Sequence, residues 1–289
     1  RVHRQVREAF FAAALAKSFT SQQEQVTSLA QRLKGIAQAR FDAGDVPQLE
    51  VLQADLEVAR AEADLEVARE QQKVAGSQLS MLLNEPGDTD WDLVTPLETM
   101  PPSQTLTELV QRAVTSNPDL QHLAQEAKVE RSHTSTLRAG RIPDVSLEAG
   151  ADFNAPLEYR AGARAQISVG LPLFSRNQGE LEQSSATLRA IEGETLAMRR
   201  SVAGEVEASW YELNSKVTQV VLYRDKVLPV GKQLQDLAEQ SYQLGRTNIL
   251  TVLDAQRAAQ QNERDYLQSL FDLQQAFAAL EEVVGVNLN

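Results

Sequence analysis

Residues 241–255 read SYQLGRTNILTVLDA, and residues 40–54 read RFDAGDVPQLEVLQA. The two stretches share identical or similar residues at one constant offset: Phe41/Tyr242, Gly44/Gly245, Leu49/Leu250, Val51/Val252, Leu52/Leu253 and Ala54/Ala255. Farther upstream, VREAFF at 6–11 resembles VEASWY at 206–211. A similarity that recurs at a nearly fixed spacing indicates a duplicated unit. We predict that each copy contains a long helix, a tight turn and a second long helix.

The glycines of this phrase suit the tight turns, because glycine adopts positive φ angles at helix C-termini without steric cost. Pro47 fits the first turn of the helix that follows. Long helices are therefore predicted over residues 1–40, 48–84, 178–244 and 249–284. Small residues are expected along the packing seam of the second helix: Ala54, Ala59, Ala61, Ala63 and Ala68.

Apolar residues in the last two helices recur at alternating steps of four and three, which is typical of coiled-coil seams. Pro229 lies within the first of these two helices and should kink it or remove one hydrogen bond. The seam residues are Val206, Trp210, Leu213, Val217 and Val220, then Tyr266, Leu270, Leu273, Phe277, Leu280 and Val284.

The segment between the copies has a different composition. Residues 86–104 are rich in proline and predict a linker. A helix is predicted over 105–116. Asn117-Pro118 starts another that runs to about residue 140, since asparagine caps helix N-termini and proline fits the first position.

Two runs, 143–154 and 160–174, alternate strictly between apolar and polar residues, the pattern of strands with one apolar face. Their length also matches the ~10 residues of a transmembrane β-strand. Two interpretations stay open, a soluble sheet that covers a core and a hairpin of a membrane barrel. The apolar face contains Val145, Leu147, Phe153, Ile167, Val169 and Leu171, and Tyr159 lies near a strand end, where aromatic girdles occur.

Composition excludes several classes of function. The net charge is −12 without a basic run, which argues against nucleic-acid binding, and cysteine is absent, which excludes disulfides. No apolar run approaches the ~20 residues of a membrane-spanning helix. The three histidines show no metal-ligand spacing, and neither a phosphate-binding loop nor a nucleophile motif is present. We therefore predict no enzyme activity, no cofactor and no metal site.

Taken together and in this order, the motifs resemble those of the outer-membrane factors, the TolC-like exit ducts of Gram-negative efflux and secretion systems. The matching features are the Asn117-Pro118 restart, the Ile142-Pro143 entry to a strand, the Leu171-Pro172-Leu173-Phe174 exit, and the repeated Tyr242-to-Ala255 phrase. The resemblance covers nearly the whole chain.

The resemblance implies a mainly α fold in which long antiparallel coiled-coil helices form an α-barrel. A β-hairpin contributes to a transmembrane β-barrel, and the fold is an internal repeat. The expected segments are a first helical hairpin at 1–85, a linker at 86–104, two helices at 105–141, the membrane hairpin at 142–174, and a second helical hairpin at 175–289.

The resemblance also implies a homotrimer in the outer membrane, in contact with lipid, whose helices cross the periplasm as a passive duct. A periplasmic adaptor protein and, indirectly, an inner-membrane pump are the implied partners. The transported substrate cannot be read from the sequence. About 95 residues, with another helix and hairpin, are expected to precede residue 1, because the second repeat is longer than the first.

In the family, the turns at Gly44 and Gly245 form the periplasmic tip, where polar contacts close the entrance. The resemblance places Tyr242 at the tip tyrosine, Asp254 at an aspartate of the constriction and Glu50 at an acidic gate partner. Arg246 lies one position before the gating arginine, and Thr247 takes that position. An Arg246–Glu50 pair is one hypothesis for the gate. The opposing interpretation is that Asp254 is an ordinary helix-surface charge.

Two other functions compete with the duct. A periplasmic adaptor also carries a long helical hairpin, but it should show one hairpin flanked by lipoyl-like and β-barrel segments. A soluble structural coiled coil would need no lipid-facing strands. Two helical hairpins with one strand pair between them favour the duct.

Overall fold

The computed structural model describes residues 2–87, 89, 91–155, 159–170 and 177–288, and the side chains of all of these except 152–155 and 159–161. The chain forms two compact units, residues 1–113 with 205–289 and residues 114–204. We call them the first and second units.

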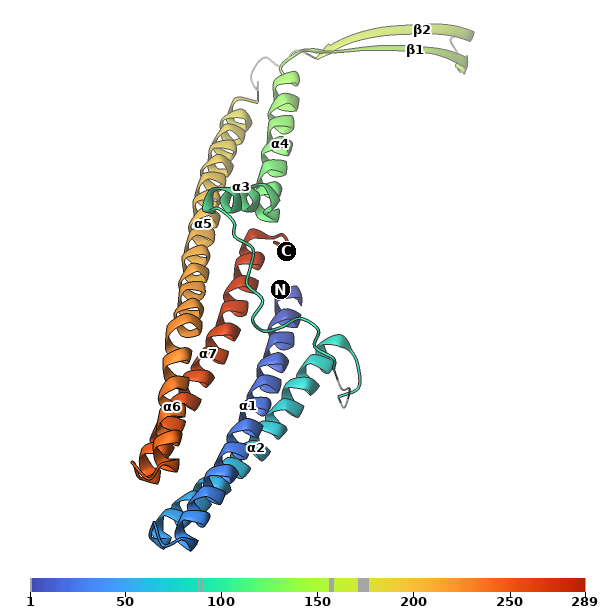
Figure 1. Ribbon diagram of the computed structural model, residues 1–289. Helices are drawn as coiled ribbons and strands as arrows, with labels where there is room; N and C mark the ends of the chain where they lie inside the picture. Colours follow the sequence, from blue (N-terminus) through green and yellow to red (C-terminus); the bar gives the residue numbers. More distant parts are fainter. Residues whose placement is uncertain (1, 88, 90, 156–158, 171–176, 289) are drawn as a thin grey trace. The chain divides into compact units, whose positions relative to one another are not determined.

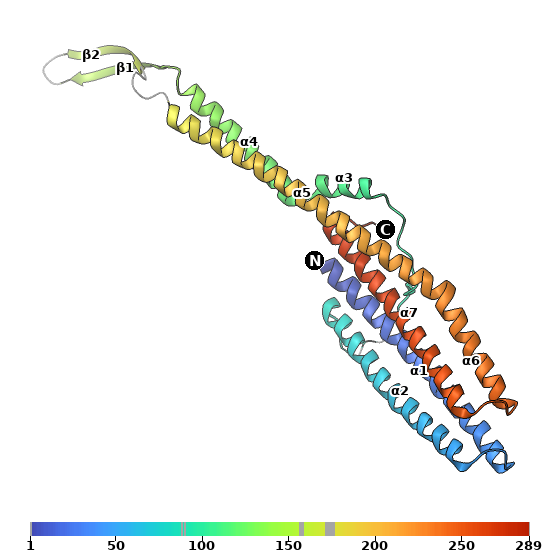
Figure 2. The same cartoon turned by 90° about the vertical axis from the view of Figure 1, so that its left-hand side faces the viewer.

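The first unit consists of two long helical hairpins (Figure 1). Helices α1 (Val2–Asp42) and α2 (Gln48–Leu83) form one hairpin. The end of α5 (Gln178–Leu222), the turn η1 (Tyr223–Val227), α6 (Leu228–Gln243) and α7 (Ile249–Val284) form the other. Helix α1 packs on both α2 and α7, and α6 packs on α7. The first unit therefore has α2 and α6 at its two edges (Figure 2).

Pro229 interrupts the long helix as the sequence predicted. The five residues before Leu228 form the π-helical turn η1, and the amide of Leu228 bonds the carbonyl oxygen of Tyr223. Proline lacks an N–H and its ring clashes with the carbonyl four residues earlier, so a wider turn accommodates it.

The predicted seams are largely confirmed. All six seam residues of α7 are buried, from Tyr266 to Val284, as are Val206, Leu213 and Val220 of α5. In α2, however, only Ala54 and Ala61 of the predicted small-residue seam are buried, and Ala59 and Ala63 are exposed. The prediction for these two alanines is wrong because they fall on the helix face opposite the buried one.

The second unit contains α4 (Pro118–Ala139), the strands β1 (Asp144–Ala155) and β2 (Tyr159–Gly170), and the first part of α5. A short helix, α3 (Leu106–Ser116), crosses the boundary between the units in sequence. The carboxamide oxygen of Asn117 accepts a 3.0 Å hydrogen bond from the amide of Leu120, which confirms the predicted cap. Thr134 of α4 and Ser184 of α5 bond each other at 2.7 Å.

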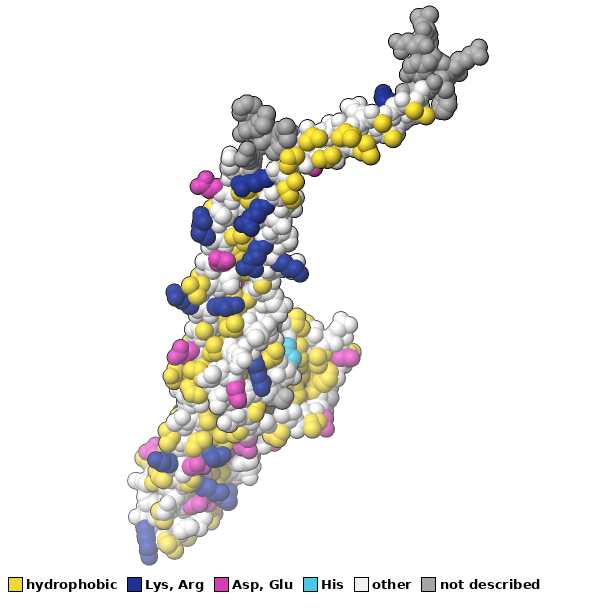
Figure 3. Space-filling view, turned by 90° about the horizontal axis from the view of Figure 1, so that it is seen from above, with side chains coloured by type: hydrophobic (Ala, Val, Ile, Leu, Met, Phe, Trp, Pro, Cys, Tyr) yellow, Lys and Arg dark blue, Asp and Glu magenta, His cyan; other side chains and the backbone are white. Residues whose placement is uncertain are grey.

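The strands pair antiparallel in a register that keeps the two faces chemically distinct. Val145 lies opposite Val169 and Leu147 opposite Ile167, whereas Ser146 lies opposite Ser168. The four large apolar side chains are 49–73% exposed, and Figure 3 shows hydrophobic side chains gathered along the hairpin. Predicted residue Leu171 lies outside the described residues, and Phe153 and Tyr159 are placed in the strands by backbone only.

Within the described residues, no helix combines the length and the apolar character needed to cross a membrane.

Candidate functional site

The two repeated turns lie together at one end of the first unit, which we call the tip. Both have the same backbone hydrogen bonds. In the first turn, the amide of Gly44 donates to the carbonyl of Phe41, and the amide of Asp45 donates to the carbonyl of Arg40. In the second turn, the amide of Gly245 donates to the carbonyl of Tyr242, and the amide of Arg246 donates to the carbonyl of Ser241. The glycines have φ angles of 82° and 71°. This is the Schellman arrangement, in which a residue with positive φ ends a helix.

A shared apolar core holds the two turns in place. Its buried residues come from both hairpins: Leu33, Ala37, Val51, Ala54, Tyr242, Ile249, Val252 and Leu253. Four helices therefore meet at the tip, although they belong to repeats about 200 residues apart. Movement of one hairpin against the other would expose this core.

Tyr242 is the polar centre of the tip. Its side chain is 0% exposed, and its hydroxyl donates a 2.9 Å hydrogen bond to Oε2 of Glu50 on α2. Burial and the bond to Glu50 raise the pKa of Tyr242 to about 12, with Arg40 acting in the opposite direction. Tyr242 and Glu50, which the resemblance placed separately at the tip, are thus in direct contact.

Arg40 of α1 contacts both the ring and the backbone of Tyr242. Its Nη1 donates a 3.0 Å hydrogen bond to the carbonyl oxygen of Tyr242. Its guanidinium carbon lies 4.7 Å from the centroid of the tyrosine ring. This is the geometry of a cation–π contact.

Two ion pairs also join the hairpins near the tip. Arg32 of α1 bonds Glu239 of α6 at 2.8 Å, and Arg257 of α7 bonds Glu57 of α2 at 2.7 Å. The hydrogen bond to Glu57 raises the pKa of Arg257. Arg257 also lies 3.6 Å from Asp254, whose side chain is 75% exposed. Asp254 is therefore partly neutralised by a neighbour on its own helix.

The other predicted tip residues make fewer contacts. Arg246 is exposed and Thr247 half-buried. The hydrogen bond of the Glu50 carboxylate comes from Tyr242. No Arg246–Glu50 ion pair occurs among the described residues, so the structure does not bring this hypothesised pair together.

Sequence reasoning missed Arg40, Arg32, Glu57 and Arg257. Arg40 begins the repeated stretch, but its counterpart in the second copy is Ser241, so comparison of the copies does not single it out. The Asp254–Arg257 pair has a visible signal, since residues three apart on a helix are neighbours. The contacts between the two hairpins leave no such signal in the sequence.

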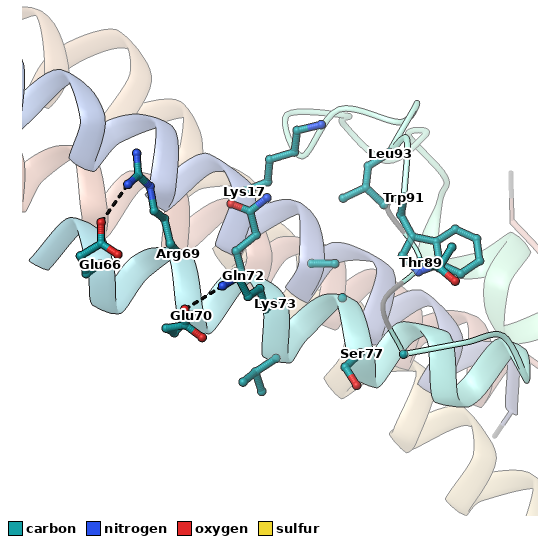
Figure 4. Close-up of a pocket in the computed structure, with 14 residues that line it drawn as sticks. Lys17, Glu66, Arg69, Glu70, Gln72, Lys73, Ser77, Thr89, Trp91 and Leu93 are labelled. Atoms are coloured by element: carbon teal, nitrogen blue, oxygen red, sulfur yellow. Dashed lines mark hydrogen bonds and ion pairs between the residues drawn. The ribbon is translucent and has the colours of Figure 1, made fainter.

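A groove of about 840 Å³ lies farther along the first hairpin, between α1, α2 and the loop after α2. Figure 4 shows Trp91 and Leu93 of the loop at one end, and the Arg69–Glu66 pair of α2 toward the other. Trp91 donates a 2.8 Å hydrogen bond to Ser80. No group of three or more potential metal ligands occurs in the described part of the chain.

Comparison with known proteins decides the family. Residues 109–286 match the family model of the outer membrane efflux proteins. The chain belongs to this family. It is 25% identical over 284 residues to the cobalt-zinc-cadmium resistance protein CzcC of Cupriavidus metallidurans, an alignment that covers 98% of this chain and 68% of that protein.

Solved structures show the same fold. The channel CusC superposes with a TM-score of 0.69 at 18% identity, over 99% of this chain and 68% of that one. The outer membrane protein VceC of Vibrio cholerae superposes with a TM-score of 0.67 at 16% identity, over 100% of this chain and 70% of that one. The chain spans about two thirds of the length of these relatives.

Family and fold confirm three predictions from the sequence. The chain is an outer-membrane efflux component, its outer-membrane location follows from the family, and its fold is that of TolC-like channels. The family consists of efflux ducts rather than known enzymes.

Proposed function

We propose that the chain forms part of a passive exit duct. The helical hairpins line a tunnel across the periplasm, the β-hairpin joins a barrel in the outer membrane, and the tip is the periplasmic entrance. A periplasmic adaptor protein docks at the tip and connects the duct to an inner-membrane pump.

The exposed apolar face of the β-hairpin carries this proposal. Val145, Leu147, Ile167 and Val169 are at least 49% exposed, so the described residues leave this face largely uncovered. A lone two-stranded ribbon is marginal in water. Lipid on the apolar face and further strands paired to both edges would stabilise the ribbon. The function of a soluble coiled coil or of an adaptor would not require such an exposed apolar face.

The edges of the first unit support assembly with further copies. Helix α2 exposes a stripe on the side opposite its buried face: Leu49, Leu52, Leu56, Val67, Val74 and Met81. At the other edge, α6 and its end expose Val230, Leu234, Leu237 and Leu244. The steps are three, four or seven residues, except for one of eleven between Leu56 and Val67, and these spacings keep the residues on one helix face, as helix pairing requires.

Different surfaces at the two edges produce head-to-tail contacts, which close into a ring when the rotation fits. We therefore propose that α2 of one copy packs against α6 of the next in a homotrimer. Val74 of the stripe also lines the groove of Figure 4, so the groove belongs to the edge that the next copy would cover.

The contacts at the tip support an entrance that can close. Tyr242–Glu50, Arg32–Glu239 and Arg257–Glu57 all link the two hairpins. Exposed ion pairs contribute about 0–1 kcal/mol each, so a docking protein can replace them at small cost. We propose that Tyr242 and Glu50 are the central pair of this gate, with Asp254 near its opening and Arg246 and Thr247 on the turn that faces the adaptor.

Similarity to the cobalt-zinc-cadmium resistance protein favours divalent metal cations as cargo. The net charge of −12 is compatible with passage of cations, since acidic surfaces attract them. Deletion of the gene should then sensitise the host to zinc or cadmium. Unchanged metal tolerance with increased sensitivity to an organic drug would assign the duct to another cargo.

The duct itself is tested in a host that lacks its own exit ducts. The full-length protein, expressed with its adaptor and pump, should restore export, and the purified protein should form channels in planar lipid bilayers. Protein that fractionates with the periplasm and forms no channel would favour the soluble coiled coil.

A further inference from the structure

A guanidinium group at the tip makes two contacts with the second hairpin and lies close to the turn at Gly245. Arg40 Nη1 donates to the carbonyl of Tyr242 at 3.0 Å, and the guanidinium faces the Tyr242 ring at 4.7 Å. Its Nη2 lies 3.5 Å from the place where a side chain on residue 245 would begin. One arginine of α1 thus covers the last turn of α6 and the turn that follows.

The position of Arg40 is electrostatically favourable. Helix α6 ends at Gln243, so the carbonyl of Tyr242 belongs to its last turn, where the helix dipole is negative and a cation is stabilised. This carbonyl also accepts a 2.9 Å hydrogen bond from Gly245. Arg40 and Gly245 together supply a donor to each lone pair of this carbonyl oxygen.

Tyr242 is therefore held from two sides by the first hairpin. Arg40 of α1 contacts its ring and its carbonyl, and Glu50 of α2 accepts from its hydroxyl. The corresponding residues do not repeat this arrangement with the two copies exchanged. Phe41, the counterpart of Tyr242, is 38% exposed, and Ser241 and Thr251 occupy the positions that correspond to Arg40 and Glu50.

We propose that Arg40 is a positioning residue of the gate, which latches α1 to the end of α6 and holds Tyr242 in the orientation that reaches Glu50. The inference rests on the gate of the proposed function. Opening of the tip then requires Arg40 to leave the Tyr242 ring and carbonyl together. Lysine cannot replace it, because an ammonium group lacks the planar fork that stacks on the ring while it donates to a carbonyl.

The test is the leak conductance of the full-length protein in planar bilayers without adaptor. Arg40→Ala and Arg40→Lys should both raise the leak about five-fold or more. Lys34→Ala is the matched control, since Lys34 also lies on α1 but pairs with Asp55 of α2, within its own hairpin. Its exposed ion pair predicts less than about a two-fold change. If Arg40→Ala fails to assemble, Arg40→Gln replaces it with the same expectation.

A second readout separates positioning from a general structural role. If Arg40 acts by positioning the Tyr242 hydroxyl, Arg40→Ala loses most of its effect on the leak in a Tyr242→Phe background, which has no hydroxyl to present to Glu50. An Arg40→Ala effect of the same size in the wild-type and Tyr242→Phe backgrounds would overturn the positioning role.

The outcomes also separate this inference from the gate itself. A leak raised by Tyr242→Phe but unchanged by both Arg40 variants overturns the role of Arg40 and leaves the gate. A leak unchanged in all of these variants contradicts the gate and, with it, the latch.

Discussion

Tyr242 and Glu50 are 192 positions apart in the chain, yet the tyrosine hydroxyl donates a 2.9 Å hydrogen bond to the glutamate carboxylate. The bond joins α6 to α2, the two edge helices of the first unit. Tyr242 belongs to a buried core to which α1, α2, α6 and α7 all contribute. This hydrogen bond can therefore form only while the two hairpins are packed against each other at the tip.

This contact predicts a loss of stability at high pH. The folded protein raises the pKa of Tyr242 to about 12, from about 10 in an unfolded chain. The contribution of the neutral phenol is therefore fully present below pH ~10 and is lost as the pH rises through ~12. The pH at which the tip loosens should be measured in wild type and in Tyr242→Phe, for example by protease cleavage at the turns.

The wild type should show a larger loss over this interval than Tyr242→Phe. Burial also raises the pKa of Tyr266, but Tyr266 is present in both proteins, so the difference isolates Tyr242. Superimposable pH curves would mean that the phenol does not contribute to closure.

The β-hairpin should tolerate charge on one face only. Leu147→Arg places a cation on the apolar face, opposite Ile167, and should cost about 2–4 kcal/mol if that face meets lipid at mid-depth. The adjacent Ser146→Arg lies on the polar face and is the matched control. We expect Leu147→Arg to reduce the amount of protein in the outer membrane and Ser146→Arg to leave it unchanged. Equal levels of the two variants would argue against a lipid-facing hairpin.

A charge at an edge helix should weaken assembly. Leu52→Lys on α2 and Leu237→Lys on α6 each place an ammonium group on an exposed apolar stripe. If these stripes meet between copies, both substitutions lower the temperature at which trimers dissociate, because a buried unpaired charge is costly. Ser28→Lys on the inner helix α1 serves as control. Trimers as heat-resistant as the control would place the contact elsewhere.

The glycine of the second turn should resist replacement. Gly245 has a φ angle of 71°, so Gly245→Ala should destabilise the protein by about 1 kcal/mol. Gly35→Ala, within α1 and with open space around the new methyl group, should instead stabilise it by up to about 1 kcal/mol. Thermal unfolding distinguishes the two, and a higher melting temperature for Gly245→Ala would show that this turn is not constrained.

Much of the fold could be predicted from local patterns. The repeated phrase locates both turns, Asn117-Pro118 locates the start of α4, and alternation locates the strands. These signals depend on residues close in sequence, where backbone preference and side-chain periodicity decide the structure.

The contacts of the tip could not be predicted in the same way. Internal symmetry suggests equal roles for Phe41 and Tyr242, but one is partly exposed and the other fully buried. The partners of Tyr242 come from the other copy, at positions whose counterparts are different residues. Duplication predicts the backbone of both turns, whereas the asymmetric packing of the hairpins decides which side chain is enclosed.

The most direct test of the gate is single-channel recording of the full-length protein and its Tyr242→Phe variant at neutral pH. Phenylalanine keeps the ring and removes the hydrogen bond to Glu50, worth about 1.5 kcal/mol or more for a charged acceptor, so the leak should rise about ten-fold. Phe41→Leu, at the equivalent exposed position, should leave the leak unchanged. A Tyr242→Phe channel that stays as closed as the wild type would contradict the account of a gate centred on Tyr242 and Glu50.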